Sequence, residues 1–259
     1  MINSLYIAET GINAQKTFVD VISNNIANVN TPGYKKAQVN FIDLVYNDKA
    51  NSASEIDSTS NGNKQLQGVH ITSVEQDLTP GKIKFTEHPF DVAIQGEGFI
   101  ELEMANGETG YTRMGRLRID QDGYLASVQG HKLTAHISVP SDVSNIVIAQ
   151  DGTVKGIVDG EAELVELGQI ELTRFVNPVA LTAQGDGVYL ASEQAGEKTT
   201  GQPGDSGFGK LLQGYTEESN VSMVEEMVNL VIAQRGYQLN ARVIQVSDQI
   251  LETINNLRR

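Results

Sequence analysis

The chain has 259 residues, of which 39% are hydrophobic and 20% charged, so it can bury a core and is not expected to be disordered throughout. Its 33 acidic and 19 basic residues give a formal net charge of −14, which argues against nucleic acid or an anionic membrane as a partner, because both attract clustered Lys and Arg. Cysteine is absent, which excludes disulfides and thiolate metal sites. No apolar run approaches the roughly 18 residues of a membrane span, and the N-terminus lacks the basic and continuously apolar regions of a cleaved signal peptide.

A helix is predicted over residues 3–27, because apolar residues recur there in alternating steps of three and four. It is predicted to end at residues 28–33, where Pro32 disfavours helix at the preceding residue and Gly33 can take a positive φ. The apolar members of the stripe are Leu5, Ala8, Ile12, Val19, Ile22 and Ile26.

A second helix is predicted from about residue 220 to the C-terminus, with an apolar stripe in the same alternating steps. Ser222 and Glu225 have the spacing of a capping box, and Asn220 is an alternative cap. The members of this stripe are Met223, Met227, Leu230, Tyr237, Ala241, Ile244 and Leu251. A single stripe could belong to an ordinary core helix, but matching stripes at both ends favour a coiled-coil domain and a subunit that polymerises through its ends. We therefore expect both stripes to form subunit interfaces.

The middle of the chain reads as β structure. Short β-rich runs extend from residue 69 to about residue 190, separated by Asn-Gly and Asp-Gly pairs that supply the positive φ angles of hairpin turns. These pairs begin at Asn106, Asp122, Asp151, Asp159 and Asp186. Their density predicts an antiparallel sandwich or barrel, and so an α+β fold for the whole chain.

Two polar segments flank this β region. Residues 47–67 are predicted to be either a surface loop or an extended arm that packs on neighbouring subunits. Residues 196–209 are rich in glycine and are predicted to be a linker.

The sequence offers no catalytic, cofactor-binding or metal-binding constellation. None of the four histidines, at positions 70, 88, 131 and 136, has the spacing of a metal site. The Gly96-Glu97-Gly98 stretch lacks the third glycine of a dinucleotide loop, and residues 120–123 (DQDG) fail the ligand order of a calcium loop. Both stretches are predicted to be strand turns, and we expect the protein not to be an enzyme.

Residues 23–35 (SNNIANVNTPGYK) resemble the N-terminal signature of bacterial flagellar rod and hook proteins. The residues that carry this motif are Asn24, Asn25, Asn28, Thr31, Gly33 and Tyr34. Further stretches similar to the family lie at residues 5–11, 41–46, 91–99, 111–113, 213–221, 226–230 and 234–237, so the resemblance spans nearly the whole chain.

The resemblance implies a structural subunit of the distal rod, which assembles into a rigid tube that transmits torque to the hook and encloses an export channel. It also implies three parts: a helical domain of residues 1–30 and 216–259, a connecting domain of 31–95 and 191–215 with an arm at 47–67, and an outer β domain of 96–190. The implied partners are copies of the same chain, other rod proteins, the hook protein, the P- and L-ring proteins and the type III export apparatus, with no nucleic acid, membrane insertion or cofactor. The implied location is the basal-body rod in the periplasm.

Other functions remain open from the sequence. Residues 78–82 and 86–91 are as similar to the proximal rod protein, and a hook-type axial subunit is a related possibility. A secreted β-rich carbohydrate-active enzyme and an adhesin-like or phage-tail-like protein are the alternatives of another class. The terminal stripes argue against the enzyme, and the Asn-rich break at residues 28–33 argues against the adhesin.

Overall fold

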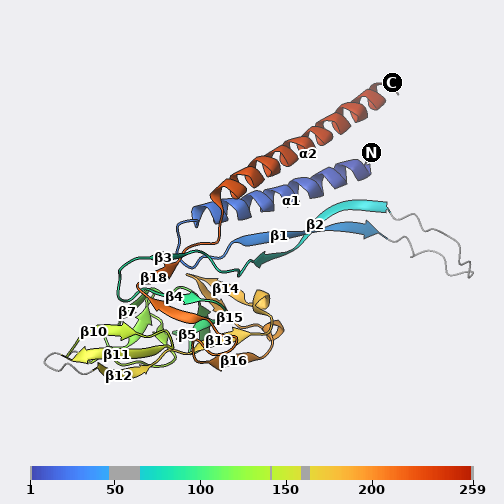
Figure 1. Ribbon diagram of the computed structural model, residues 1–259. Coiled ribbons are helices and arrows are strands. Elements are labelled where there is room, and N and C mark those ends of the chain that lie inside the picture. The colour runs from blue at the N-terminus through green and yellow to red at the C-terminus, as the bar shows by residue number, and fades with distance from the viewer. Residues whose placement is uncertain (1, 47–64, 141, 159–163, 258–259) are drawn as a thin grey trace, which may run out of the picture. The chain divides into compact units, whose positions relative to one another are not determined.

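The computed structural model describes residues 2–46, 65–140, 142–158 and 164–257. Helix α1 (Ile2–Ala27) opens the chain, helix α2 (Met223–Leu257) closes it, and the described segments between them are rich in strands (Figure 1). The predicted α+β class with terminal helices is confirmed. The expected arm lies outside the described residues, except for its last three residues, which belong to a strand.

The chain divides into two compact units, which are described separately. The helical unit comprises Met1–Ala27, Ala37–Gln76 and Ser222–Arg259, and the β unit comprises Asn28–Lys36 and Asp77–Val221. None of the described helices is both long and apolar enough to cross a membrane.

In the helical unit, α1 and α2 run antiparallel and approach closely (Figure 1). A Cβ atom on Gly11 would lie 2.7 Å from the side-chain nitrogen of Asn240, and one on Gly236 would lie 3.0 Å from the side-chain amide carbon of Gln15. Glycine at these two positions removes the side chain that would hold the helices apart. The contact between α1 and α2 is therefore built on small residues.

A hairpin of β1 (Ala37–Tyr46) and β2 (Gln65–Gln76) packs against another side of α1. Phe18 of α1 meets Phe41 of β1 edge to face, with ring centroids 5.6 Å apart. The backbone N–H of Val69 in β2 donates to the Thr10 hydroxyl at 3.4 Å. Helix α1 thus has partners within the chain on two sides.

The described residues of the β unit form four groups of antiparallel strands. The largest group has the order β14 (Thr182–Gly185), β15 (Val188–Leu190), β6 (Thr109–Thr112), β5 (Phe99–Glu103), β9 (Lys132–Leu133), β8 (Leu125–Ser127) and β7 (Leu117–Ile119), with β13 (Leu172–Phe175) pairing both β5 and β16 (Lys198–Gly201). The others are β10 (Val143–Ile148), β11 (Thr153–Val158) and β12 (Leu164–Gln169); β4 (Val92–Gln95) with β17 (Lys210–Gln213); and β3 (Ile83–Phe85) with β18 (Tyr215–Glu217). Two short 3-10 helices, η1 (Pro178–Ala180) and η2 (Glu193–Ala195), occur along the chain between β13 and β16.

The predicted turns form where their sequences require positive φ. In the β7–β8 hairpin, Gly123 has φ of 80° and its N–H donates to the Asp120 carbonyl at 3.0 Å, which confirms that residues 120–123 are a turn. Positive φ is also found at Gly107, Gly152 and Gly187. The fifth pair, at residues 159–160, lies outside the described residues.

The predicted glycine-rich linker at residues 196–209 is wrong, because β16 lies inside it and pairs with β13. A Cβ atom on Gly201 would come within 2.5 Å of the Phe208 ring. Glycine at this position permits close packing and does not signal a flexible connection.

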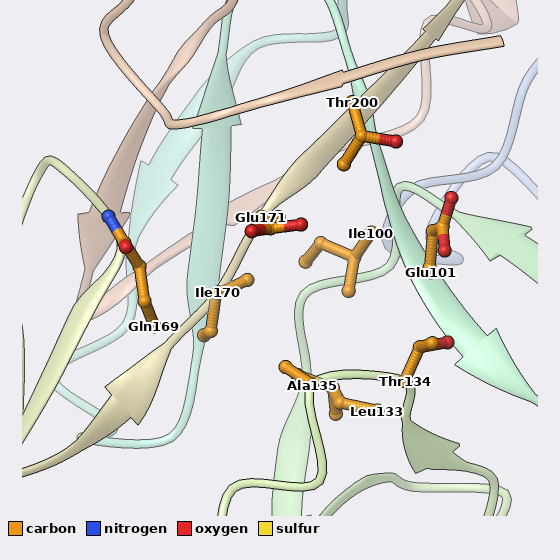
Figure 2. Close-up of a pocket in the computed structure, with 9 residues that line it drawn as sticks. All are labelled: Ile100, Glu101, Leu133, Thr134, Ala135, Gln169, Ile170, Glu171 and Thr200. Atoms are coloured by element: carbon orange, nitrogen blue, oxygen red, sulfur yellow. The ribbon is translucent and has the colours of Figure 1, made fainter.

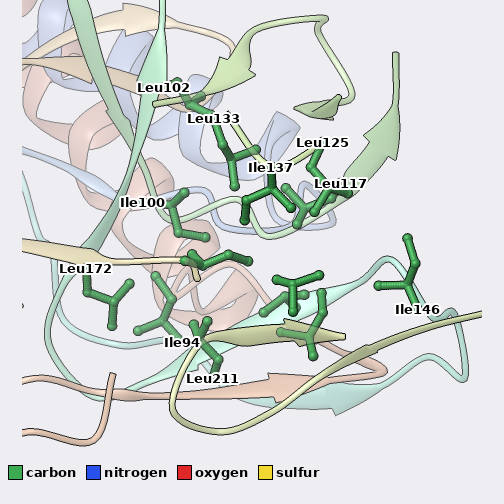
Figure 3. Packing of buried hydrophobic residues seen from close by; sticks show 14 of the residues in the cluster. Ile94, Ile100, Leu102, Leu117, Leu125, Leu133, Ile137, Ile146, Leu172 and Leu211 are labelled. Carbon is green, nitrogen blue, oxygen red and sulfur yellow. The ribbon is translucent and has the colours of Figure 1, made fainter. Parts of the chain in front are cut away.

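The main core of the β unit is aliphatic (Figure 3). It gathers side chains such as Ile94 from β4, Ile100 and Leu102 from β5, and Leu211 from β17. A smaller aromatic cluster contains Phe99, Tyr111, Phe175 and Tyr189. Burial raises the pKa of Tyr189 to about 12, so its hydroxyl stays neutral in ordinary buffers.

Candidate assembly surface

Helix α2 exposes far more apolar surface than a helix that packs only inside its own chain. Leu239 is 65% exposed and Ile232 is 58% exposed. The exposed large apolar residues of α2 are Met223, Val224, Met227, Val228, Val231, Ile232, Tyr237, Leu239, Val243, Val246, Ile250, Leu251, Ile254 and Leu257. Fully burying one side chain of this kind contributes about 1.5–3 kcal/mol, so the helix has a large driving force to acquire a partner.

The side of α2 that faces α1 is small and polar. Glu226, Ala233, Asn240 and Ser247 follow one another at seven-residue spacing; Glu226, Ala233 and Ser247 are buried, and the Asn240 side chain meets Gly11. Helix α2 therefore inverts the usual amphipathic pattern, with its apolar residues toward solvent. The periodicity in the sequence did not reveal this, because it cannot say which stripe meets which partner.

The predicted interface residues fall into three groups. Ala8 and Ile22 are 2% and 1% exposed and pack inside the helical unit. The α1 and α2 residues that are half-buried are Leu5, Ile12, Val19, Ile26, Leu230, Ala241 and Ile244. The α2 residues that are exposed are Met223, Met227, Tyr237 and Leu251. All members of the stripes other than Ala8 and Ile22 are thus at least partly accessible.

A groove of about 370 Å³ runs between α1 and α2 on one side of the pair. Lys16, Val19 and Asp20 line it from α1, and Gln234, Tyr237 and Gln238 line it from α2. Val19 and Tyr237, which belong to the predicted stripes, therefore lie on the same concave surface.

Within the sequence motif, Asn25 joins three elements of the helical unit. Its buried side chain donates to the Ala37 carbonyl and accepts from the Ala37 N–H, both at 2.9 Å. The same amide nitrogen lies 3.4 Å from a carboxylate oxygen of Glu226. Asn25 thus links the end of α1 to the start of β1 and to the first turn of α2.

The motif residues that follow α1 form the predicted helix break in the β unit. The Thr31 N–H donates to the Asn28 carbonyl at 3.1 Å, and the Tyr34 N–H donates to the Thr31 carbonyl at 3.3 Å. Gly33 has φ of 69°, and a Cβ atom there would lie 2.9 Å from the Met114 side chain. Asn24, the last member of the motif, is exposed on α1.

Beside this turn lies a buried ion cluster that the sequence analysis missed. The Glu217 carboxylate accepts from Lys35 Nζ at 2.5 Å, from Arg113 Nε at 3.0 Å and from the Gly81 N–H at 2.7 Å. The three charged side chains are 0–3% exposed. Burial lowers the pKa of Lys35, and the charge of Glu217 offsets part of that shift. All three residues lie in stretches that resemble the family, and this resemblance is the feature of the sequence from which the cluster could have been found.

Arg113 also explains the Gly96-Glu97-Gly98 stretch. Its guanidinium donates to the Gly96 carbonyl at 2.9 Å and to the Gly98 carbonyl at 3.1 Å. Both glycines have positive φ, at 126° and 132°. The stretch is therefore a turn held by Arg113. This confirms the prediction of a strand turn, which was made because the third glycine of a dinucleotide loop is missing.

Asn220 joins the segments by which the chain enters and leaves the β unit. Its side-chain oxygen accepts from the Lys36 N–H at 2.8 Å, and its nitrogen donates to the Asp77 carbonyl at 2.7 Å. Helix α2 begins at Met223, and the Ser222 carbonyl accepts its first helical bond from the Glu226 N–H at 3.0 Å. The alternative of Asn220 as the cap is therefore wrong.

The β unit also contains a cavity of about 260 Å³ (Figure 2). Its lining includes Ile100, Glu101, Ile170 and Glu171. Glu101 already accepts from Thr173 Oγ1 at 2.7 Å and from Lys198 Nζ at 3.1 Å. Among the described residues, no group of three or more His, Asp or Glu side chains gathers as a metal site would require.

The chain matches three family models. Residues 5–35 match the model described as "Flagella basal body rod protein", residues 93–156 that of "Flagellar hook protein FlgE/F/G D1 domain", and residues 212–257 that of "Flagellar basal body rod FlgEFG protein C-terminal".

Curated relatives extend this match over the full length. The chain is 39% identical to the flagellar basal-body rod protein FlgG of Borreliella burgdorferi, covering 100% of both chains. It is 38% identical to FlgG of Caulobacter vibrioides, covering 98% of this chain and 99% of the relative. The flagellar hook protein FlgE of Salmonella typhimurium is 25% identical, with 97% of this chain and 99% of that protein covered. The chain therefore belongs to the family of flagellar basal-body rod and hook proteins, and within it is most like FlgG.

Proposed function

We propose that the chain is a structural subunit of the distal rod of the bacterial flagellum, and that it self-assembles into a helical tube. One observation carries the proposal: α2 exposes apolar side chains along its full length in a chain whose full-length relatives are rod proteins. A tube built from many copies gives this surface a place to be buried, and association then supplies the hydrophobic stabilisation that the single chain lacks.

The assembly also accounts for the form of α2. The helix has 35 residues against 26 in α1, and residues 251–257 are exposed on every side. Most of the stability of a protein helix comes from packing of its apolar face, so a long exposed helix is stabilised chiefly by a partner. Neighbouring copies of the chain provide such partners.

The finer organisation expected from the sequence belongs to the same proposal. The terminal helices form coiled coils in the tube, the β unit is a sandwich-like or barrel-like body, and its residues divide between a connecting domain (31–95 with 191–215) and an outer domain (96–190). The helical domain of residues 1–30 and 216–259 surrounds the export channel. The tube transmits torque to the hook.

The proposed partners are other rod proteins below, the hook protein above, and the P- and L-ring proteins around the tube. The chain reaches the periplasm through the flagellar type III export apparatus, without cleavage of a signal peptide. It needs no cofactor and acts without catalysis. The full-length match to FlgG favours the distal rod over the proximal rod or the hook.

The proposal is tested by electron microscopy of basal bodies from cells that lack this chain. We expect the axial structure to stop short of the hook, because the distal segment is missing, and we expect the chain supplied from a plasmid to restore it. Basal bodies of full length in the deleted cells, or ones that carry a hook, would contradict the proposal.

A further inference from the structure

A regular apolar ridge follows one flank of α2. Its members, each between 44% and 65% exposed, are Val228, Ile232, Leu239, Val243, Val246 and Ile250. Successive members are separated by four, seven, four, three and four residues, so the ridge follows one side of the helix in steps of three and four with one apolar position missing, and two steps of four meet at Leu239. Arg235, which is exposed, occupies that missing position. This ridge is distinct from the stripe of Met227, Leu230, Tyr237 and Ala241.

The α1–α2 groove lies on the opposite flank of α2. At 100° per residue, the groove residues Gln234, Tyr237 and Gln238 are centred about 150° around the helix from the ridge. A chain therefore cannot place its own ridge in its own groove, and the two surfaces are open to two different neighbours.

We propose that the ridge of one copy packs into the α1–α2 groove of the next copy; this assignment rests on the proposed function, because it takes the occupant to be a second copy of the chain. The groove presents the apolar Val19 and Tyr237 between two helices, and a row of side chains along one helix packs into the groove between other helices. The groove carries both Lys16 and Asp20, and Asp20 offers a carboxylate of opposite charge to Arg235, which interrupts the ridge.

The pairing is heterologous, because each copy uses a different surface toward each of its two neighbours. Heterologous contacts that do not close into a ring generate open helical filaments, whereas ridge-to-ridge contact would close a two-fold dimer and stop growth. The placement of ridge and groove on opposite flanks of one helix thus provides for continued polymerisation.

The absence of cysteine makes the pairing directly testable. The full-length double variant Val19→Cys/Leu239→Cys is expressed in cells that lack the native chain, and isolated basal bodies are oxidised or treated with a short bifunctional thiol reagent. We expect a ladder of covalent dimers, trimers and higher multimers on denaturing gels. The variants Val19→Cys/Ile232→Cys and Val19→Cys/Val243→Cys sample neighbouring positions of the ridge, so a single variant that fails to fold does not decide the result.

Matched controls separate this pairing from others. Each single-cysteine variant is expected to stay monomeric on the gel, and so is Val19→Cys/Gln249→Cys, which places the second thiol on an exposed α2 position off the ridge. Dimers from Leu239→Cys alone would show that ridges meet each other and would overturn the proposal. Rods of normal appearance with no cross-link from any ridge position would also overturn it, while leaving the proposed function standing. A native chain that does not enter the rod at all would instead overturn the proposed function.

Discussion

We expect the Leu239→Asp chain to fold normally but not to assemble into rods. Leu239 is 65% exposed in the single chain, so a carboxylate there remains hydrated and costs little in folding. In an assembled interface the same carboxylate must leave water without a partner, which costs on the order of several kcal/mol per subunit. Circular dichroism should show an unchanged fold, and electron microscopy of basal bodies should show no distal rod.

The exposed polar residue Gln249 provides the matched control for this variant. Gln249→Asp adds the same charge to the same helix but off the ridge, and it should assemble like the parent chain. Equal assembly of the two variants would mean that the ridge is not buried in the rod. Loss of helix content in Leu239→Asp would mean that the site already contributes to the fold of the single chain.

The second large effect is expected at the buried ion cluster of the β unit. Glu217→Ala leaves Lys35 and Arg113 buried without their shared carboxylate. Removing one partner from a buried ion pair typically lowers the free energy of unfolding by about 3–5 kcal/mol, because the remaining charge is uncompensated. Denaturant unfolding of the full chain, followed by a signal from the β unit, should show a loss of this size.

The next residue, Glu218, provides the control for the effect of Glu217→Ala on the free energy of unfolding. Glu218 is 44% exposed in its side chain and lies 3.5 Å from the exposed Lys84. Glu218→Ala should lower the free energy of unfolding by less than about 1 kcal/mol, because water screens a surface ion pair. Similar losses for the two variants would show that the Glu217 cluster does not hold the fold together.

The structural elements that could be predicted are those determined by residues close together in the sequence. The end of α1 is determined by the Asn-rich break and the positive φ of Gly33, and both depend on a few adjacent residues. The hairpin turns depend on Asn-Gly and Asp-Gly pairs in the same way, as the turn at Gly123 shows.

The features that could not be predicted depend on residues far apart in the chain. Lys35, Arg113 and Glu217 each look like solvated surface charges in the sequence, and only the fold brings them together in a buried cluster. The glycine-rich stretch around Gly201 looked like a linker, because the sequence does not show that the Phe208 ring would pack against it. Likewise, the sequence does not show whether Ile22 packs against its own chain or a neighbour, and the structure buries it within its own chain.

The central claim is that the exposed apolar surface of α2 is the surface through which this subunit assembles. Electron cryomicroscopy of rods built from this chain, at a resolution that shows side chains, tests it directly. We expect Ile232, Leu239 and Val246 to be buried against another copy and the groove beside Tyr237 to be filled. A rod in which these side chains still face solvent, with the subunits held together only through their β units, would contradict it.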